Sequence, residues 1–340
     1  MAEALVYLVT GGCGFIGEHI VQLLCKQDYV SEVRVFDAMA SEEVKKLATG
    51  KETRDIRDYT LLLSAMRGVH VVIHTAAIVD ISDTVPFQEM KTVNVAGKCF
   101  KLCGSLLLLV FIYLRGTEDT DYSGEVELPY GKTKAWAQKL VLEANGKKVS
   151  NNGGKLATCI IAPNAVYGEK SLTLKNSYIS VKAKGGVLDY VEPEDTERNY
   201  IYVGNVAWMH VLAARSLQLK PDVLAGQVYY AYDDTPIRKG CLVRYELLSA
   251  MDTSVKLGSR IPYWKIWLQI YFSKIIKILL YPFWKSQPFL NLPLLNTLVT
   301  TFSYETNKAF RHFGYMPLYS WEESKRRTGS WLQHAGPMAP

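Results

Sequence analysis

Residues 5–17 read Leu5-Val6-Tyr7-Leu8-Val9-Thr10-Gly11-Gly12-Cys13-Gly14-Phe15-Ile16-Gly17, and this stretch decides the fold. Its apolar first half predicts a buried β-strand, and the glycines after it predict a tight turn into a helix over residues 18–26. The free N–H groups and the positive dipole end of a helix N-terminus attract phosphate where no side chain blocks the approach. The stretch therefore predicts a pyrophosphate site, although glycine-rich turns also join strands to helices without binding one.

The three glycines of this turn have separate tasks. Gly11 permits the sharp turn, Gly14 lets the backbone close on the ligand, and Gly17 lets the helix pack closely on the strand. Phe15 and Ile16 lie in the same turn, and we expect them to contact the ligand with the glycines. The spacing is G-x-x-G-x-x-G rather than G-x-G-x-x-G, so the assignment depends on residues further along the chain.

A second apolar strand, residues 33–36, ends in Asp37, twenty residues after the last glycine. A carboxylate at this position accepts hydrogen bonds from the adenosine ribose hydroxyls of a dinucleotide. It also repels a 2′-phosphate, so the sequence favours NAD over NADP as the cofactor. The alternative is an ordinary solvated residue at a strand end.

A third apolar run, residues 71–74, predicts a buried parallel strand that ends in the small residues Thr75, Ala76 and Ala77. Ligands of open α/β sheets bind at the carboxyl ends of the strands, so we expect these three residues to contact the dinucleotide. His74 is interpreted as a hydrogen-bonded structural residue rather than a catalytic one.

Asp55 and Ile56 precede a helical pattern. Asp55 is placed to accept a hydrogen bond from the adenine amino group, with Ile56 against the ring. The alternative is that Asp55 or Asp58 caps the helix.

Tyr130 and Lys134 stand four residues apart in a predicted helix, so they share one face of it. An ammonium group beside a phenol, together with a cationic nicotinamide, stabilises the phenolate. Tyr130 could then accept a proton from a substrate hydroxyl while the adjacent carbon loses a hydride to the nicotinamide. Lys134 would lower the pKa of Tyr130 and hold the nicotinamide ribose. The pattern occurs often by chance, and only its place after a nucleotide-binding fold gives it weight.

Composition agrees with an α/β enzyme. The 340 residues are 49% hydrophobic and carry a net charge of +6. Such a chain can bury a large core, and its spread-out basic residues give no sign of nucleic-acid binding. The six cysteines have no metal-site spacing, so we expect no metal and a reducing compartment. We recognise no signal peptide before the first strand and expect the enzyme domain to fold in the cytosol.

Further motifs along the chain are typical of one family. They are Asn94-Val95-Ala96-Gly97, Tyr167-Gly168-Glu169, Tyr202-Val203-Gly204-Asn205, His312-Phe313-Gly314-Tyr315 and Ser320-Trp321-Glu322. With these motifs the chain resembles the 3β-hydroxysteroid dehydrogenase family of extended short-chain dehydrogenases, and its opening glycine stretch is similar to the branch acting on C27 sterols in bile-acid synthesis. The resemblance implies oxidation of a 3β-hydroxyl on a Δ5 steroid by NAD, followed by migration of the double bond to Δ4.

Three features depart from the family pattern. Relatives carry a strand and a serine-rich turn between the counterparts of Asn94 and Tyr130, whereas this shorter segment has an apolar run followed by Thr117. Residues 48–54 are too polar for a central strand, so we expect part of a strand to be missing there. Ala162 stands at a position where relatives usually have arginine.

Residues 262–281 combine aromatic and aliphatic side chains with interrupting lysines. The run is about long enough to span a bilayer, but each lysine at the bilayer centre would cost roughly 2.5–3.5 kcal/mol. A helix lying in the membrane interface avoids that cost, and residues 289–302 could extend the contact. The alternative is a helix packed over the substrate pocket. With the resemblance, this segment predicts location at the endoplasmic reticulum membrane, with the catalytic domain facing the cytosol.

We therefore predict a doubly wound parallel sheet with a smaller C-terminal substrate domain. Residues 1–165 form the NAD-binding domain, to which 198–215 return, and 166–340 are mainly the substrate domain with a membrane-associating segment at about 262–302. The expected partners are a steroid or sterol and a membrane surface, with a homo-oligomer left open. The alternatives are a catalytically silent NAD- or sterol-binding protein, which the lost serine turn favours, and a nucleotide-sugar epimerase.

Overall fold

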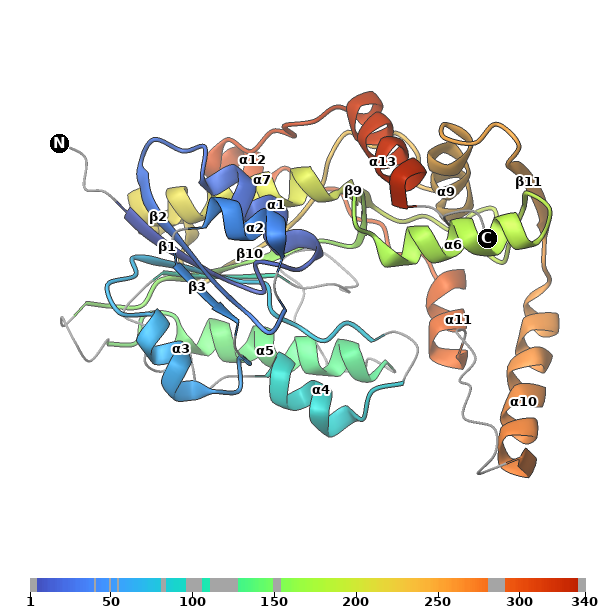
Figure 1. The fold of residues 1–340 in the computed structure, drawn as a ribbon, viewed down its shortest axis with the longest axis horizontal. Helices are drawn as coiled ribbons and strands as arrows, with labels where there is room; N and C mark the ends of the chain where they lie inside the picture. The colour runs from blue at the N-terminus through green and yellow to red at the C-terminus, as the bar shows by residue number, and fades with distance from the viewer. Residues whose placement is uncertain are drawn as a thin grey trace.

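The computed structural model describes residues 5–39, 41–48, 50–53, 55–80, 84–95, 106–110, 128–148, 154–280 and 291–335. Within them, seven parallel strands form one sheet in the order β10-β6-β5-β4-β1-β2-β3 (Figure 1). Strand β1 lies between β2 and β4, so the chain order reverses there, and the predicted doubly wound sheet is confirmed. The strands are β1 (Leu5–Thr10), β2 (Val30–Asp37), β3 (Gly50–Thr53), β4 (Val71–His74), β5 (Leu106–Val110), β6 (Thr158–Ala162) and β10 (Gln227–Tyr230).

Helices cover both faces of this sheet because side chains alternate along each strand. In β1, Tyr7 and Val9 enter the core on one face, while Leu8 enters the core on the other. The first face is covered by α1 (Phe15–Leu24), α2 (Glu42–Leu47), α7 (Val203–Leu219) and α12 (Lys308–Phe313) (Figure 1). The second face is covered by α3 (Tyr59–Ala65), α4 (Phe87–Asn94) and α5 (Pro129–Ala144) (Figure 1).

A smaller unit lies beside the sheet and has its own hydrophobic core, to which Leu174, Leu247 and Leu332 belong. Residues 198–215 contain β9 (Tyr200–Tyr202) and most of α7, and α7 packs against α1. The predicted domain boundaries themselves stay a prediction. The elements are β7 (Ala165–Tyr167) paired with β9 (Tyr200–Tyr202), β8 (Val187–Tyr190) paired with β11 (Lys256–Arg260), α6 (Leu172–Ala183), α9 (Gly240–Ser249) and α13 (Trp321–Ala335). The short helix α8 (Pro221–Leu224) instead contributes Leu224 to the core of the large sheet.

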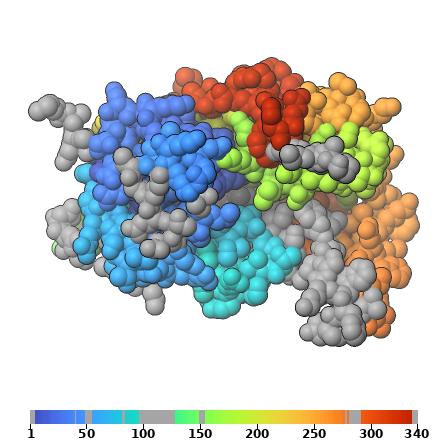
Figure 2. Space-filling view, in the orientation of Figure 1, coloured from blue at the N-terminus to red at the C-terminus, as the bar shows by residue number. Residues whose placement is uncertain are grey.

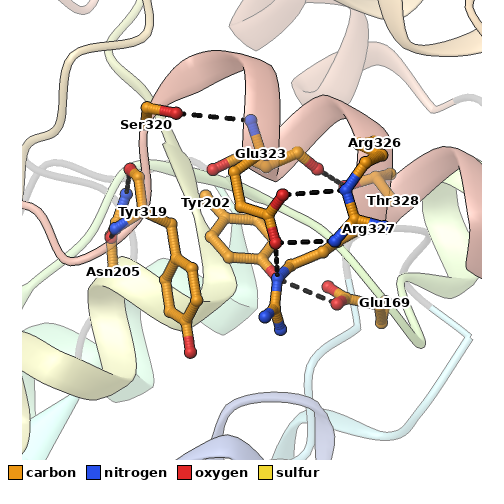
Figure 3. A network of polar contacts seen from close by, with 10 residues as sticks. Glu169, Tyr202, Asn205, Tyr319, Ser320, Glu323, Arg326, Arg327 and Thr328 are labelled. Carbon is orange, nitrogen blue, oxygen red and sulfur yellow. Dashed lines mark hydrogen bonds and ion pairs between the residues drawn. The ribbon is translucent and has the colours of Figure 1, made fainter.

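Hydrogen bonds fasten the C-terminal segment to the start of α7. The Asn205 side chain accepts the Tyr319 N–H at 2.8 Å and donates to the Tyr319 carbonyl at 2.9 Å (Figure 3). The Tyr202 ring meets Tyr319 edge-on, and its hydroxyl donates to Glu169 at 2.8 Å. In the space-filling view the red C-terminal residues lie along the upper edge, between blue N-terminal residues and orange ones (Figure 2). The end of the described chain thus secures the junction between the sheet and the smaller unit.

The strand expected to be incomplete before Asp55 is present as β3. It pairs in parallel with β2, with Asp37 opposite Thr53, and it forms the edge of the sheet. The sequence-based expectation was wrong because polar residues exclude a central strand more strongly than an edge strand, which has a neighbour on one side only. The apolar run of the shortened segment forms β5, which pairs in parallel with both β4 and β6. Thr117 lies outside the described residues.

Helices α10 (Tyr263–Leu280) and α11 (Leu292–Val299) extend away from the rest of the molecule (Figure 1). Helix α10 leaves large apolar side chains in contact with solvent, since Trp264 is 58%, Phe272 59% and Leu279 74% exposed. Among the described residues, no helix has both the length and the apolar character needed to cross a membrane.

Candidate active site

The glycine turn leaves the start of α1 as bare backbone. Gly11 has φ of +72°, and a Cβ there would lie 2.5 Å from the Ala76 nitrogen. A Cβ on Gly17 would lie 2.0 Å from the Gly11 carbonyl oxygen, so neither position accepts a side chain. Gly14 is exposed and N-caps α1 without any side-chain cap. The first N–H groups of the helix are therefore free to bind a ligand next to Gly14, and this arrangement fits a pyrophosphate. The helix begins at Phe15 and ends at Leu24, slightly earlier than predicted.

The structure brings Asp37 to this turn. Its carboxylate accepts the N–H of Cys13 at 2.8 Å and that of Met39 at 2.9 Å. The register explains the approach, because Thr10 on β1 lies opposite Phe36 on β2 and the two chains leave the sheet side by side. A carboxylate oxygen has two lone pairs, so Asp37 retains acceptor capacity toward a ribose hydroxyl.

The end of β4 completes the same edge of the sheet. The Thr75 hydroxyl donates to the Thr10 carbonyl at 2.8 Å, and Ala76 lies against Gly11. His74 is buried, with Nδ1 2.6 Å from the Thr10 hydroxyl oxygen. Burial, with a smaller contribution from the Lys134 ammonium, lowers the pKa of His74 to about 3. His74 is thus neutral at physiological pH, as suits the structural role that we assigned to it. Ala77 is half-buried just after the strand.

Asp55 is engaged locally. It forms an ion pair with Arg57 and accepts the Arg57 backbone N–H at 2.9 Å, and the hydrogen bonds from Arg57 hold the pKa of Asp55 below its usual range. Asp58, the alternative that we left open, caps α3 by accepting the Leu61 N–H at 3.1 Å. Ile56 is buried in the core that contains Phe36. Contact of Asp55 and Ile56 with an adenine ring stays a prediction.

Tyr130 and Lys134 lie one turn apart at the start of α5, where Pro129 occupies the first helical position. Tyr130 is 1% exposed and Lys134 9% exposed. The Lys134 ammonium nitrogen lies 5.7 Å from the centre of the Tyr130 ring. Burial lowers the pKa of Lys134 to about 8, so the amine remains mostly protonated at neutral pH while sitting in a poor solvent for charge. A buried cation next to a phenol is the electrostatic setting that stabilises a phenolate.

Asn94 and Thr133 connect these two regions, and we did not assign them to the site from the sequence. Asn94 is buried at the end of α4, accepts the Ile78 N–H at 2.8 Å and donates to the Ile78 carbonyl at 3.0 Å. It also donates to the Thr133 hydroxyl at 3.0 Å, which in turn donates to the Tyr130 carbonyl at 2.7 Å. The loop after β4 and the first turn of α5 are therefore held together. The only signal for this role was the motif that begins at Asn94.

Most of the predicted site residues thus gather at the carboxyl ends of β1, β2 and β4, where the strand order reverses. Tyr130 and Lys134 are joined to that edge through Asn94. Ala162, which replaces the arginine usual in relatives, is buried in β6.

Comparison with known proteins identifies related sequences. A model of the 3-beta hydroxysteroid dehydrogenase/isomerase family matches residues 8–114 and 110–262. The chain is 39% identical to the 3 beta-hydroxysteroid dehydrogenase type 7 of Mus musculus, over 97% of this chain and 96% of that one. It is 38% identical to the Homo sapiens protein of the same name, over 98% and 97%.

Among solved structures, the fold is similar to that of UDP-glucuronic acid 4-epimerase from Bacillus cereus in complex with NAD. The TM-score is 0.67 at 16% identity, covering 98% of this chain and 100% of the epimerase. At that identity the likeness concerns the fold alone. The family model matches residues 8–114 and 110–262 and the two mammalian relatives align with nearly the whole chain, so the chain belongs to the 3-beta hydroxysteroid dehydrogenase/isomerase family.

Proposed function

We propose that this protein oxidises the 3β-hydroxyl of a Δ5 steroid or sterol with NAD as the oxidant, followed by movement of the double bond from Δ5 to Δ4. Family membership supports the reaction class. The observation that carries the proposal for this chain is the buried Tyr130 and Lys134 pair, joined through Asn94 to the edge of the sheet that holds the glycine turn. The relatives of type 7 favour a C27 sterol as the substrate.

In this proposal each residue has one task. NAD, when bound, supplies the nicotinamide carbon that accepts the hydride. Tyr130 takes the proton from the 3β-hydroxyl, and Lys134 stabilises the phenolate and donates to the nicotinamide ribose. Asn94 and Thr133 set the position of the first turn of α5, so that Tyr130 stays fixed relative to the cofactor edge. The isomerisation requires a group that moves a proton from C4 to C6, and no described residue is assigned to it.

The glycine turn, Asp37 and the end of β4 would hold the dinucleotide. The start of α1 would hold the pyrophosphate, and the carboxylate of Asp37 would accept from the adenosine ribose and disfavour the 2′-phosphate of NADP. Comparable affinity for NAD and NADP in calorimetry would contradict this part of the proposal.

Helix α10 would place the protein on the cytosolic surface of the endoplasmic reticulum membrane. Its exposed apolar residues are accompanied by lysines and by no acidic residue between positions 263 and 280. Apolar side chains can enter the lipid interface while lysines reach anionic headgroups, an arrangement that avoids burying charge. A membrane surface is also where a water-insoluble sterol is concentrated.

A second reading is a silent NAD- or sterol-binding protein, which the missing serine turn favours. The experiment that separates the two is NADH formation by the detergent-solubilised full chain, offered 3β-hydroxy-Δ5 sterols and NAD. Turnover that disappears in Tyr130→Phe supports the dehydrogenase. A folded protein that binds NAD but turns over no sterol would support the silent reading.

A further inference from the structure

Lys170 has an uncommon backbone conformation. With φ of 70°, it is the one non-glycine residue with a positive φ among the described residues. It follows Gly168 and Glu169 in the loop between β7 and α6, and a Cβ on Gly168 would lie 2.4 Å from a Val203 side-chain carbon. Residues other than glycine rarely adopt this backbone conformation, so it persists only where surrounding contacts require it.

The contacts that hold Lys170 come from the other part of the molecule. Its ammonium nitrogen lies 2.7 Å from each carboxylate oxygen of Glu18, and 2.6 Å from one oxygen of Glu43. Glu18 belongs to the first turn of α1, and Glu43 to the first turn of α2. The side chain of Glu18 is only 4% exposed, while that of Glu43 is 63% exposed. A residue of the loop that leads into α6 thus joins the two helices that flank Asp37.

Glu18 places a negative charge close to the predicted pyrophosphate site. It directly follows Gly17, and with a rise of about 1.5 Å per residue its Cα lies roughly 6 Å along the helix axis from Gly14. A carboxylate in this turn interacts well with the helix dipole, but it repels a doubly negative pyrophosphate bound at the same helix end. Screening by water is weak for a buried group, so the repulsion would reduce cofactor affinity unless a cation compensates it.

Glu18 also influences the ribose side. The Ser41 hydroxyl donates to Glu18 at 3.3 Å and accepts the Val44 N–H at 3.4 Å, which caps α2. The loop between Asp37 and α2 is therefore hydrogen-bonded, through Ser41, to the same Glu18 carboxylate that Lys170 contacts.

We propose that Lys170 is a positioning residue for cofactor affinity: by neutralising Glu18, it allows the pyrophosphate of NAD to approach the start of α1. The inference rests on the pyrophosphate site of the proposed function and is independent of the steroid chemistry. It also assigns a task to the strained loop, because that loop supplies the ammonium group that pairs with Glu18.

The test is NAD binding by titration calorimetry, at a pH near 8, with unfolding temperatures measured in the absence of NAD. Lys170→Met should bind NAD about tenfold more weakly, which corresponds to about 1.4 kcal/mol. The double variant Glu18→Gln/Lys170→Met should return to within about twofold of the wild type, because the repelling charge is gone. Lys45→Met is the matched control: Lys45 is similarly exposed and pairs with Glu42, so its loss should leave the affinity unchanged.

A further variant keeps the inference testable if Lys170→Met does not fold. Glu18→Gln alone leaves Lys170 in place and should tighten NAD binding about threefold or more. Unchanged affinity in folded Lys170→Met, or no recovery in the double variant, would overturn the inference, as would unchanged or weaker binding by Glu18→Gln. A wild-type protein that binds no NAD would instead refute the proposed function, so the two failures are distinguishable.

Discussion

Replacing Lys134 with methionine should stabilise the protein and strongly reduce its turnover. Burial lowers the pKa of Lys134 from 10.5 to about 8. That change corresponds to roughly 3 kcal/mol of unfavourable free energy for keeping the charged amine in the folded protein at neutral pH. The favourable contact of the ammonium with the Tyr130 ring offsets about 0.5–1 kcal/mol. We therefore expect Lys134→Met to raise the free energy of unfolding by roughly 2 kcal/mol, while NADH formation falls by about 10²-fold or more.

The pH dependence gives this prediction a sign. The amine titrates near pH 8 in the folded protein and near 10.4 in the unfolded chain, so between these values the unfolded chain binds more protons. Wild-type stability should therefore rise, relative to the variant, from about pH 8 to about pH 10.4, and the advantage of the variant should vanish above that range.

The assay is urea unfolding without cofactor, at about pH 7 and again at about pH 9.5. Lys132→Met is the control, because Lys132 is exposed on the same helix and should change stability by less than about 0.5 kcal/mol. A variant that is less stable than the wild type at neutral pH would refute the reasoning, and so would an advantage that does not shrink at high pH.

Three other predictions concern the glycine turn, the base and the exposed helix. Gly17→Ala should weaken NAD binding by at least about tenfold in calorimetry, because its Cβ would lie 2.0 Å from the Gly11 carbonyl oxygen. Tyr130→Phe should reduce NADH formation by about 10²–10⁴-fold and leave the NAD dissociation constant within about twofold; a variant that retains turnover would remove Tyr130 from its proposed task. Trp264→Ser/Phe272→Ser should lower binding to anionic vesicles by about tenfold in a co-sedimentation assay, since both side chains are more than half exposed. The control is Leu219→Ser on α7, and equal binding by both proteins would contradict the membrane proposal.

Local patterns predicted the parts of the fold that depend on neighbouring residues. The strand, turn and helix over residues 5–24 follow from an apolar run and glycines in one short stretch, and the pairing of Tyr130 with Lys134 follows from helical spacing. The edge strand β3 could not be predicted in this way. Polarity argues against a central strand, but whether a strand is central depends on the order of the sheet, which no local pattern contains.

The candidate site shows the same division. Asn94 contacts Ile78 and Thr133, which are 16 and 39 residues away, so its importance depends on how two loops and a helix meet. Lys170 is separated from Glu18 by 152 residues, and no local sequence pattern predicted its left-handed backbone conformation. The sequence predicted which side chains could take part in binding and catalysis. The residues that position those side chains became evident only from the structure.

The departures from the family pattern therefore differ in consequence. The polar run before Asp55 still forms the edge strand β3. It therefore leaves intact the carboxyl ends of β1, β2 and β4, where the predicted cofactor site lies. In the shortened segment, β5 remains in register with both of its neighbours, with Leu109 opposite His74 and Ile160. The sheet is thus continuous across β5, and Asn94 is hydrogen-bonded to Thr133 on the helix that carries Tyr130. The sequence predicts that the shortening removes the serine turn which, by the family resemblance, would orient the substrate oxygen. A defect there would lower the rate of hydride transfer while NAD affinity stayed normal, so NAD binding and sterol turnover must be measured on the same preparation.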